Sequence, residues 1–243
     1  MKPAQTSGST RWSPAFIAAI AVAAALAIAA VIVLLVLKDD NNPAAAPATT
    51  GPGTTASEPT SGPAAAAATP PTAAPPGVTW TLVGQSAVPA SASEGPTRMA
   101  GCVASGFAHT PTGALIAAAQ ISTRSGYYAG RSCWEPTITG QFTASADRDT
   151  LLTLLKDADA KGQPGAAPGE LAQIVAFRFM SYTANTAVVG LIRRNPQGRL
   201  AQTTLTLTWA DDDWKLVAPP GGQWPALTTT VTSLTGSVPW GAS

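Results

Sequence analysis

The chain has 243 residues, of which 45% are hydrophobic and 11% charged, and its 14 Lys and Arg against 13 Asp and Glu leave a formal net charge of +1. A charge balance this close to neutral offers no electrostatic footprint for nucleic acid, and a single histidine excludes a metal site built from several histidines. We therefore expect neither a nucleic-acid partner nor a metal.

The amino-terminal part contains one long apolar segment, residues 14–37, which has no charge, no side-chain amide and no hydroxyl group. As a helix rising about 1.5 Å per residue, this segment can cross a hydrocarbon core about 30 Å thick, so we predict a transmembrane helix in the lipid bilayer. The preceding residues 1–13 carry Lys2 and Arg11 and no acid, whereas Lys38 on the other side is followed by two aspartates. The positive-inside rule therefore predicts a single-pass cell-membrane protein with a cytoplasmic tail (1–13) and an extracellular carboxyl-terminal domain.

A cleaved signal peptide is the alternative interpretation, because residues 44–48 are small enough for a cleavage site. The apolar run is longer than the roughly 7–15 residues of a signal h-region, which favours the anchor. Residues 38–77 are mostly Ala, Pro, Thr, Gly and Ser and lack large apolar side chains, so we predict a disordered linker, whose composition also permits O-glycosylation. The remaining residues, 78–243, are then one extracytoplasmic domain large enough to bury a core.

The domain opens with an alternating segment, Val78–Val83, that predicts a strand, and a turn-rich stretch follows through Pro96. Thr110 is a suitable N-cap for a helix over residues 111–122, with proline at its first position. This helix is apolar on nearly every face, so we expect the rest of the domain to enclose it. Residues 123–143 contain several Gly and Pro and predict irregular structure.

A second, amphipathic helix is predicted over residues 146–160, followed by a loop at 162–169. Strands are predicted over 171–183, 186–194, 200–209 and 214–217. In the third of these, Leu205, Leu207 and Trp209 alternate with threonines, which indicates one buried face. Helices followed by an antiparallel meander predict an α+β domain, and we expect a curved antiparallel sheet packed on the helices as a cone.

Both cysteines, Cys102 and Cys133, lie beyond the predicted anchor, where oxidising conditions would let them pair. We predict a disulfide, with two unpaired buried thiols as the alternative. Cys102 with His109 lies in no recognisable signature of a nucleophile and its base, so we do not assign them catalysis.

Three further polar features have structural interpretations. His109 at the lip of a helix is expected to hydrogen-bond nearby backbone, and Asp211–Asp213 to form a solvated turn without the spaced ligands of a calcium loop. Arg193, Arg194 and Arg199 bracket one hairpin, where they could touch an acidic partner or a lipid head group but are better interpreted as ordinary edge charges. We predict no catalytic, cofactor-binding or metal-binding residue, and no enzyme activity. We also expect Trp240, near the carboxyl end, to dock on its own domain.

Several motifs of the domain carry a resemblance: Trp80, Pro89, Gly95-Pro96, the block GFAHTPTGAL at residues 106–115 and the terminal VPWG at residues 238–241. On these motifs the chain resembles a group of actinobacterial single-pass membrane proteins of unassigned function that occur with integrative and conjugative elements. Its predicted fold is similar to the nuclear-transport-factor-like cone used by bitopic assembly factors of type IV secretion. The resemblance implies no catalytic residue.

Two functions follow from this reading of the sequence. The first is a non-enzymatic, membrane-anchored extracytoplasmic scaffold that contacts other membrane or secretion-apparatus proteins of a conjugative transfer or type IV secretion-like apparatus. The alternative is an envelope-associated module that binds a ligand in an apolar pocket of the cone. A hollow cone would favour the module, and a cone filled by its own side chains would favour the scaffold.

Overall fold

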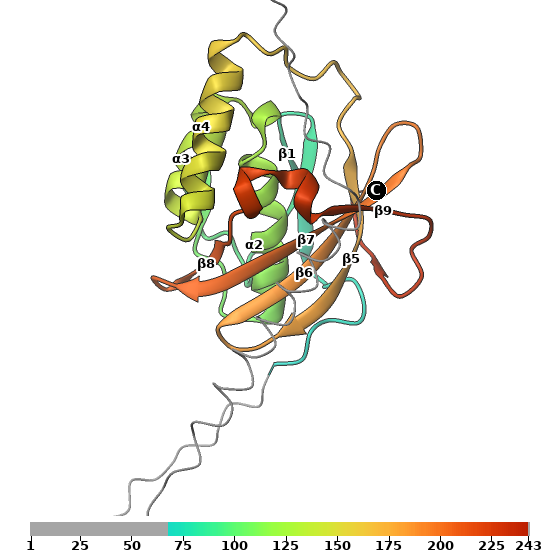
Figure 1. Ribbon diagram of the computed structural model, residues 1–243. Helices are drawn as coiled ribbons and strands as arrows, with labels where there is room; N and C mark the ends of the chain where they lie inside the picture. Colours follow the sequence, from blue (N-terminus) through green and yellow to red (C-terminus); the bar gives the residue numbers. More distant parts are fainter. Residues whose placement is uncertain (1–67, 243) are drawn as a thin grey trace, which may run out of the picture. The chain divides into compact units, whose positions relative to one another are not determined.

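The structure is a computed structural model that describes residues 68–242 of the chain (Figure 1). The predicted cytoplasmic tail (1–13), the predicted transmembrane helix (14–37) and most of the predicted linker (38–77) lie outside these residues. Within the described part, no helix is both long enough and apolar enough to cross a bilayer.

The described residues form an α+β domain with helices on one face of a mostly antiparallel sheet (Figure 1). The helices are α2 (Pro111–Arg124), α3 (Arg131–Gln141) and α4 (Ala146–Ala160), with single 3-10 turns η1 (Tyr127–Ala129), η2 (Pro220–Gly222) and η3 (Trp224–Leu227). The strands are β1 (Val78–Val83), β2 (Ser86–Ser91), β3 (Arg98–Ala100), β4 (Val103–Ser105), β5 (Gln173–Tyr182), β6 (Thr186–Arg194), β7 (Leu200–Ala210), β8 (Asp213–Leu216), β9 (Thr228–Val231) and β10 (Val238–Pro239).

The main sheet has six strands. Five of them follow the order β10-β5-β6-β7-β8, and each strand runs antiparallel to the next. The ninth strand, β9, pairs with one end of β7 while β8 pairs with the other, so both lie along the same edge of β7. The predicted meander is confirmed: β6 has the predicted bounds, and β5, β7 and β8 differ from theirs by one or two residues.

The central helix α2 is confirmed. Its N-cap is Thr110, whose hydroxyl accepts a hydrogen bond from the backbone N–H of Gly113 at 2.9 Å, and Pro111 is the first helical residue. Every side chain from Ala114 to Ala119 is fully buried, because the sheet covers one side of α2 while the β1–β2 hairpin and α3 cover others. An all-apolar helix surface requires such enclosure.

The expectation of irregular structure over residues 123–143 was wrong, because α3 occupies much of that stretch. Its buried side chains form two rows in which successive members are four residues apart: Cys133, Thr137 and Gln141 in one, and Trp134 and Ile138 in the other. Burial of this face outweighs the unfavourable helix propensity of Pro136, which lies on the exposed side. Helix α4 has the predicted bounds and is mostly exposed, with Leu151 as its one buried residue.

The stretch before Pro96, which was predicted as turns, contains a strand, β2. Strand β2 forms a hairpin with the predicted strand β1, and Val88 at its centre is fully buried. A buried glutamine on α2, Gln120, donates to the backbone oxygen of Pro89 at 2.8 Å and joins the hairpin to the helix. A second small hairpin, β3–β4, precedes α2.

The carboxyl-terminal segment supplies strand β10, which pairs with the edge of β5 that does not face β6. Trp240 is buried, as predicted, and packs edge-on against Trp80 and Phe177 with ring centroids 5.0 and 5.4 Å apart. The beginning of the described chain lies next to its end, since Ala74 lines one surface cleft together with Gly241. The two ends of the domain are therefore neighbours.

Candidate functional site

The predicted disulfide is present in the structure and joins Cys102 to Cys133. Cys102 lies in the turn between β3 and β4, and Cys133 lies in the first turn of α3, so the bond fixes the small hairpin to the helix. With its sulfur in a disulfide, Cys102 has no thiol that could act as a nucleophile with His109.

The GFAHT segment before α2 is held by a carboxylate from β8. The backbone N–H groups of Gly106 and Phe107 each donate to an oxygen of Asp213 at 3.0 Å, and Gln141 approaches the same carboxylate at 3.4 Å. Asp213 is only 2% exposed, so its assignment to a solvated turn was wrong. Its neighbours Asp211 and Asp212 are exposed turn residues with left-handed backbone angles, as a solvated turn requires.

Most of the GFAHTPTG block is explained by folding. Gly106 has a φ of +75°, which only glycine adopts without strain, and a Cβ on Gly113 would lie 2.1 Å from the backbone oxygen of Ala108. The same oxygen accepts a hydrogen bond from the indole N–H of Trp214 at 2.9 Å. The motif that carries the resemblance therefore builds the entry to α2, and reactive chemistry is not needed to account for it.

His109 also has structural partners. Its ring stacks on Trp209 with centroids 3.9 Å apart and an interplanar angle of 6°, and its Nε2 contacts the backbone oxygen of Ala184. The expected contact with backbone is thus present, but its partner lies in the β5–β6 turn. Among the described residues, no three His, Cys, Asp or Glu side chains gather in a way that could hold a metal ion.

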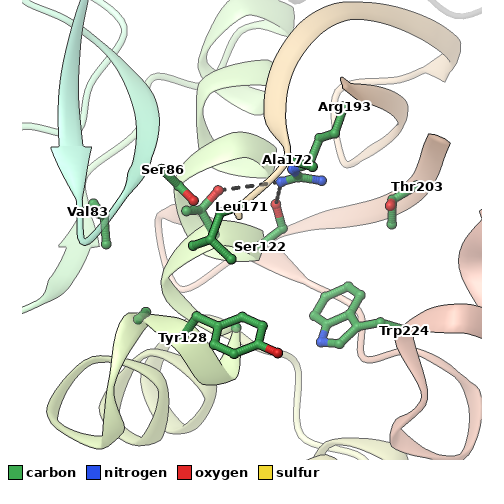
Figure 2. Close-up of a pocket in the computed structure, with 12 residues that line it drawn as sticks. Val83, Ser86, Ser122, Tyr128, Leu171, Ala172, Arg193, Thr203 and Trp224 are labelled. Carbon is green, nitrogen blue, oxygen red and sulfur yellow. Dashed lines mark hydrogen bonds between the residues drawn. The ribbon is translucent and has the colours of Figure 1, made fainter. Parts of the chain in front are cut away.

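A cavity of about 280 Å³ lies at the carboxyl-terminal end of α2 (Figure 2). Its walls come from the end of α2, the β1–β2 hairpin, η1, the segment before β5, strands β6 and β7, and η3. Figure 2 shows the guanidinium group of Arg193 on one side of this cavity, with Tyr128 and Trp224 across from it.

The position of Arg193 corrects its interpretation as an ordinary edge charge. Side chains alternate along β6, so Arg193 continues the row of Ala187, Val189 and Leu191, all of which are fully buried. It is half-buried, whereas the adjacent Arg194 is exposed. Its Nη2 group donates to the hydroxyl groups of Ser122 at 3.0 Å and Thr123 at 3.4 Å, at the last turn of α2. The sequence analysis missed this site. The signal that could have revealed it is the spacing of two residues that puts Arg193 on the same face of β6 as Leu191 and Val189.

The guanidinium of Arg193 has no carboxylate partner among the described residues. Burial lowers the pKa of Arg193 to about 10, because removal from water disfavours the charged form. Burial lowers the pKa of Arg124, at the same end of α2, for the same reason. Arg124 fulfils a structural role, since it donates to the side chain of Gln120 at 2.7 Å and to the backbone oxygen of Cys102 at 2.9 Å.

Among models of protein families, that of a domain of unknown function (DUF8175) matches residues 40–239. No curated protein and no solved structure matches the chain.

Proposed function

The chain belongs to the family of the domain of unknown function DUF8175, and we propose that it is a non-enzymatic scaffold outside the cell membrane, anchored by residues 14–37, in a conjugative transfer or type IV secretion-like apparatus. The cone-like shape implied by the resemblance, the lipid anchor and the contacts with other membrane or secretion-apparatus proteins are parts of this proposal.

The observation that carries the proposal is the filled space between α2 and the sheet. The largest fully buried side chains include Trp134, Trp214 and Phe177, and they pack in one continuous core with the apolar residues of α2. Because these side chains fill the core, the domain has no room there for a ligand, and a partner would bind on its surface. This arrangement supports a scaffold over a carrier that encloses a ligand in its core.

The reactive side chains of the domain support a non-enzymatic role. His109 is engaged by a tryptophan ring and a backbone oxygen, and Asp213 is engaged by backbone N–H groups. Cys102 is in a disulfide. General acid–base or nucleophilic catalysis requires such groups to face a substrate together, and each of these has a partner within the fold instead.

A transfer assay in the native host tests the proposal. Deleting the gene should abolish conjugative transfer, and the full chain should restore it, whereas a chain without residues 14–37 should not. The anchorless chain, followed by immunoblot, controls for expression. Transfer that is unchanged by the deletion would refute the role in the apparatus, and a full chain recovered from the soluble cytosol would refute the anchor.

Photo-crosslinking identifies the partner. A photoreactive residue placed at Leu82, Met99 or Met180, which are the exposed apolar positions on strands, should form adducts with membrane proteins of the transfer apparatus. Adducts only with unrelated envelope proteins would contradict the assignment.

The alternative function, an envelope-associated module with an apolar pocket in the cone, has one observation in its favour. The cavity at the end of α2 is open to a ligand, although a half-buried guanidinium lines it. A purely apolar ligand does not suit that group.

A further inference from the structure

We infer that the cavity at the carboxyl-terminal end of α2 binds a small organic anion, a carboxylate or phosphate attached to an apolar or aromatic body, and that Arg193 binds the anionic group. This inference refines the alternative ligand-binding function and does not depend on the scaffold role. Its failure would leave the transfer assay unaffected.

The first argument is the unbalanced charge. A half-buried guanidinium group pays a desolvation cost, which a nearby carboxylate normally offsets. Arg193 has none within the described residues, and its hydrogen bonds go to two neutral hydroxyl groups. Burial also lowers its pKa to about 10, with no opposing effect from an acidic neighbour. An anion bound in the cavity would supply the missing countercharge.

A purely structural role at the end of α2 does not explain this arrangement. A basic side chain can stabilise a helix by bonding its last carbonyl groups. Here Arg193 bonds the hydroxyl groups of Ser122 and Thr123, while the backbone N–H and hydroxyl of Ser125 donate to the carbonyls of Ile121 and Ser122. The general attraction of the helix dipole for a cation remains, but it does not use the N–H groups of Nε and Nη1, which have no partner among the described residues.

The guanidinium group of Arg193 has donors left for an anion. A guanidinium group has five N–H donors in a plane, and only those of Nη2 have partners among the described residues. The N–H groups of Nε and Nη1 have no partner among the described residues. A guanidinium group binds a carboxylate in pairs through Nε with Nη2 or through Nη1 with Nη2, and Nη2 is already engaged. An anion in the cavity would therefore accept a single charge-assisted hydrogen bond from Nε or Nη1.

The rest of the cavity suits an apolar body. Tyr128 and Trp224 lie across from the guanidinium in Figure 2, and Val83 and Leu171 add aliphatic surface. Tyr128 is 49% exposed, and its ring meets that of Tyr127 edge-on with centroids 5.8 Å apart. At about 280 Å³ the cavity is slightly smaller than typical small-molecule sites, which begin at about 300 Å³, so the ligand is small.

Calorimetric titration of the full chain in detergent micelles, at constant ionic strength, tests the inference. The probes are benzoate and phenyl phosphate, with benzamide as the neutral analogue of benzoate and inorganic phosphate as the anion without a body. Benzoate or phenyl phosphate should saturate the protein at millimolar concentration, and benzamide should bind about tenfold more weakly or not at all. Equal binding of benzoate and benzamide would overturn the assignment of an anion site, and saturation by neither anion would overturn the inference.

Two variants and a control locate the site. Arg193→Gln should weaken binding of both anions about tenfold or more, whereas Arg199→Gln, an exposed arginine in the turn after the same strand, should change it by less than about twofold. Tyr128→Ala should weaken phenyl phosphate and leave inorganic phosphate unchanged. Retained affinity in the Arg193 variant would overturn the assignment.

The melting temperature separates binding from folding. Because Arg193 lacks a countercharge, Arg193→Gln without added anion should melt at the same temperature as the parent chain or higher, and should lose the upward shift that phenyl phosphate causes in the parent. A lower melting temperature without anion would show that Arg193 serves the fold, and would overturn the inference.

Discussion

One carboxylate, that of Asp213, determines how the chain enters its central helix. It is 2% exposed, and it accepts hydrogen bonds from the backbone N–H groups of Gly106, Phe107 and its own neighbour Trp214, each at 3.0 Å. Bonds to a charged acceptor in a buried site are among the stronger single contributions to stability. The segment that they hold leads directly to Thr110, the N-cap of α2.

Replacing this carboxylate should therefore be costly. We expect Asp213→Asn to lower the free energy of unfolding by about 1–3 kcal/mol, because the amide offers one acceptor oxygen and presents N–H groups to a backbone donor. Asp212→Asn is the matched control: it is exposed, asparagine tolerates its left-handed backbone, and the change should stay within about 0.5 kcal/mol. Urea unfolding followed by tryptophan fluorescence measures both. Equal costs for the two variants would contradict the role given to Asp213.

The sequence does not distinguish these aspartates, because three consecutive acids look alike until a partner is known. Two of the partners of Asp213 are backbone N–H groups more than 100 residues earlier in the chain. Arg193 was more accessible to prediction, since the period of two along β6 places it in the buried row. Without the positions of Ser122 and Tyr128, however, the row alone does not reveal a cavity.

Among the elements, α3 shows tertiary packing overriding local preference. Its Pro136 lacks the N–H that would bond the backbone oxygen of Ser132, and its ring crowds the preceding turn. The helix persists because Trp134 and Ile138 are fully buried on its other side. Local signals alone predicted α2 and α4, where caps and apolar spacing agree, and they failed for α3, where Gly and Pro oppose burial.

The cost of this proline can be measured. Pro136→Ala should raise the free energy of unfolding by about 1–2 kcal/mol, because alanine restores the helical N–H and the gain exceeds the extra entropy of the unfolded chain. Thr139→Ala, on the same exposed face, should change stability by less than about 0.5 kcal/mol. A destabilised alanine variant at position 136 would show that the proline contributes a contact or a bend that the fold requires.

The closing strand β10 is held mainly by the tryptophan that follows it. Trp240→Ala should cost about 3–5 kcal/mol, because it removes a buried indole from between Trp80 and Phe177. Trp240→Phe should cost much less, because the indole N–H has no hydrogen-bond partner within the described residues. Thermal unfolding followed by near-ultraviolet circular dichroism compares the two variants, and equal losses would contradict a purely apolar role for the ring.

For the whole molecule, the disulfide is the one covalent constraint in the described residues. It joins positions 31 residues apart, and closing a loop of that length in the unfolded chain is worth about 3–4 kcal/mol. We expect the Cys102→Ser, Cys133→Ser double variant to lose about that much in guanidinium unfolding, and reductant to have no effect on it. A loss below about 1 kcal/mol would mean that the native state relaxes when the bond is absent.

At this scale the class of fold was predictable and the function was not. Alternation in Leu205, Leu207 and Trp209 and the enclosed composition of α2 were sufficient to predict an α+β domain with an antiparallel sheet. Function depends on which surfaces meet other molecules, and composition does not encode that. The most distinctive motif, GFAHTPTG, is largely explained by the geometry at the start of α2.

The neighbouring ends of the domain also make circular permutation of the chain possible. Because Ala74 and Gly241 line one cleft, a short peptide could join them and new termini could be opened at the exposed Gly165, between α4 and β5, with the order of strands in the sheet unchanged. For the same reason the domain could be inserted whole into a surface loop of another protein, which would display it without residues 1–67.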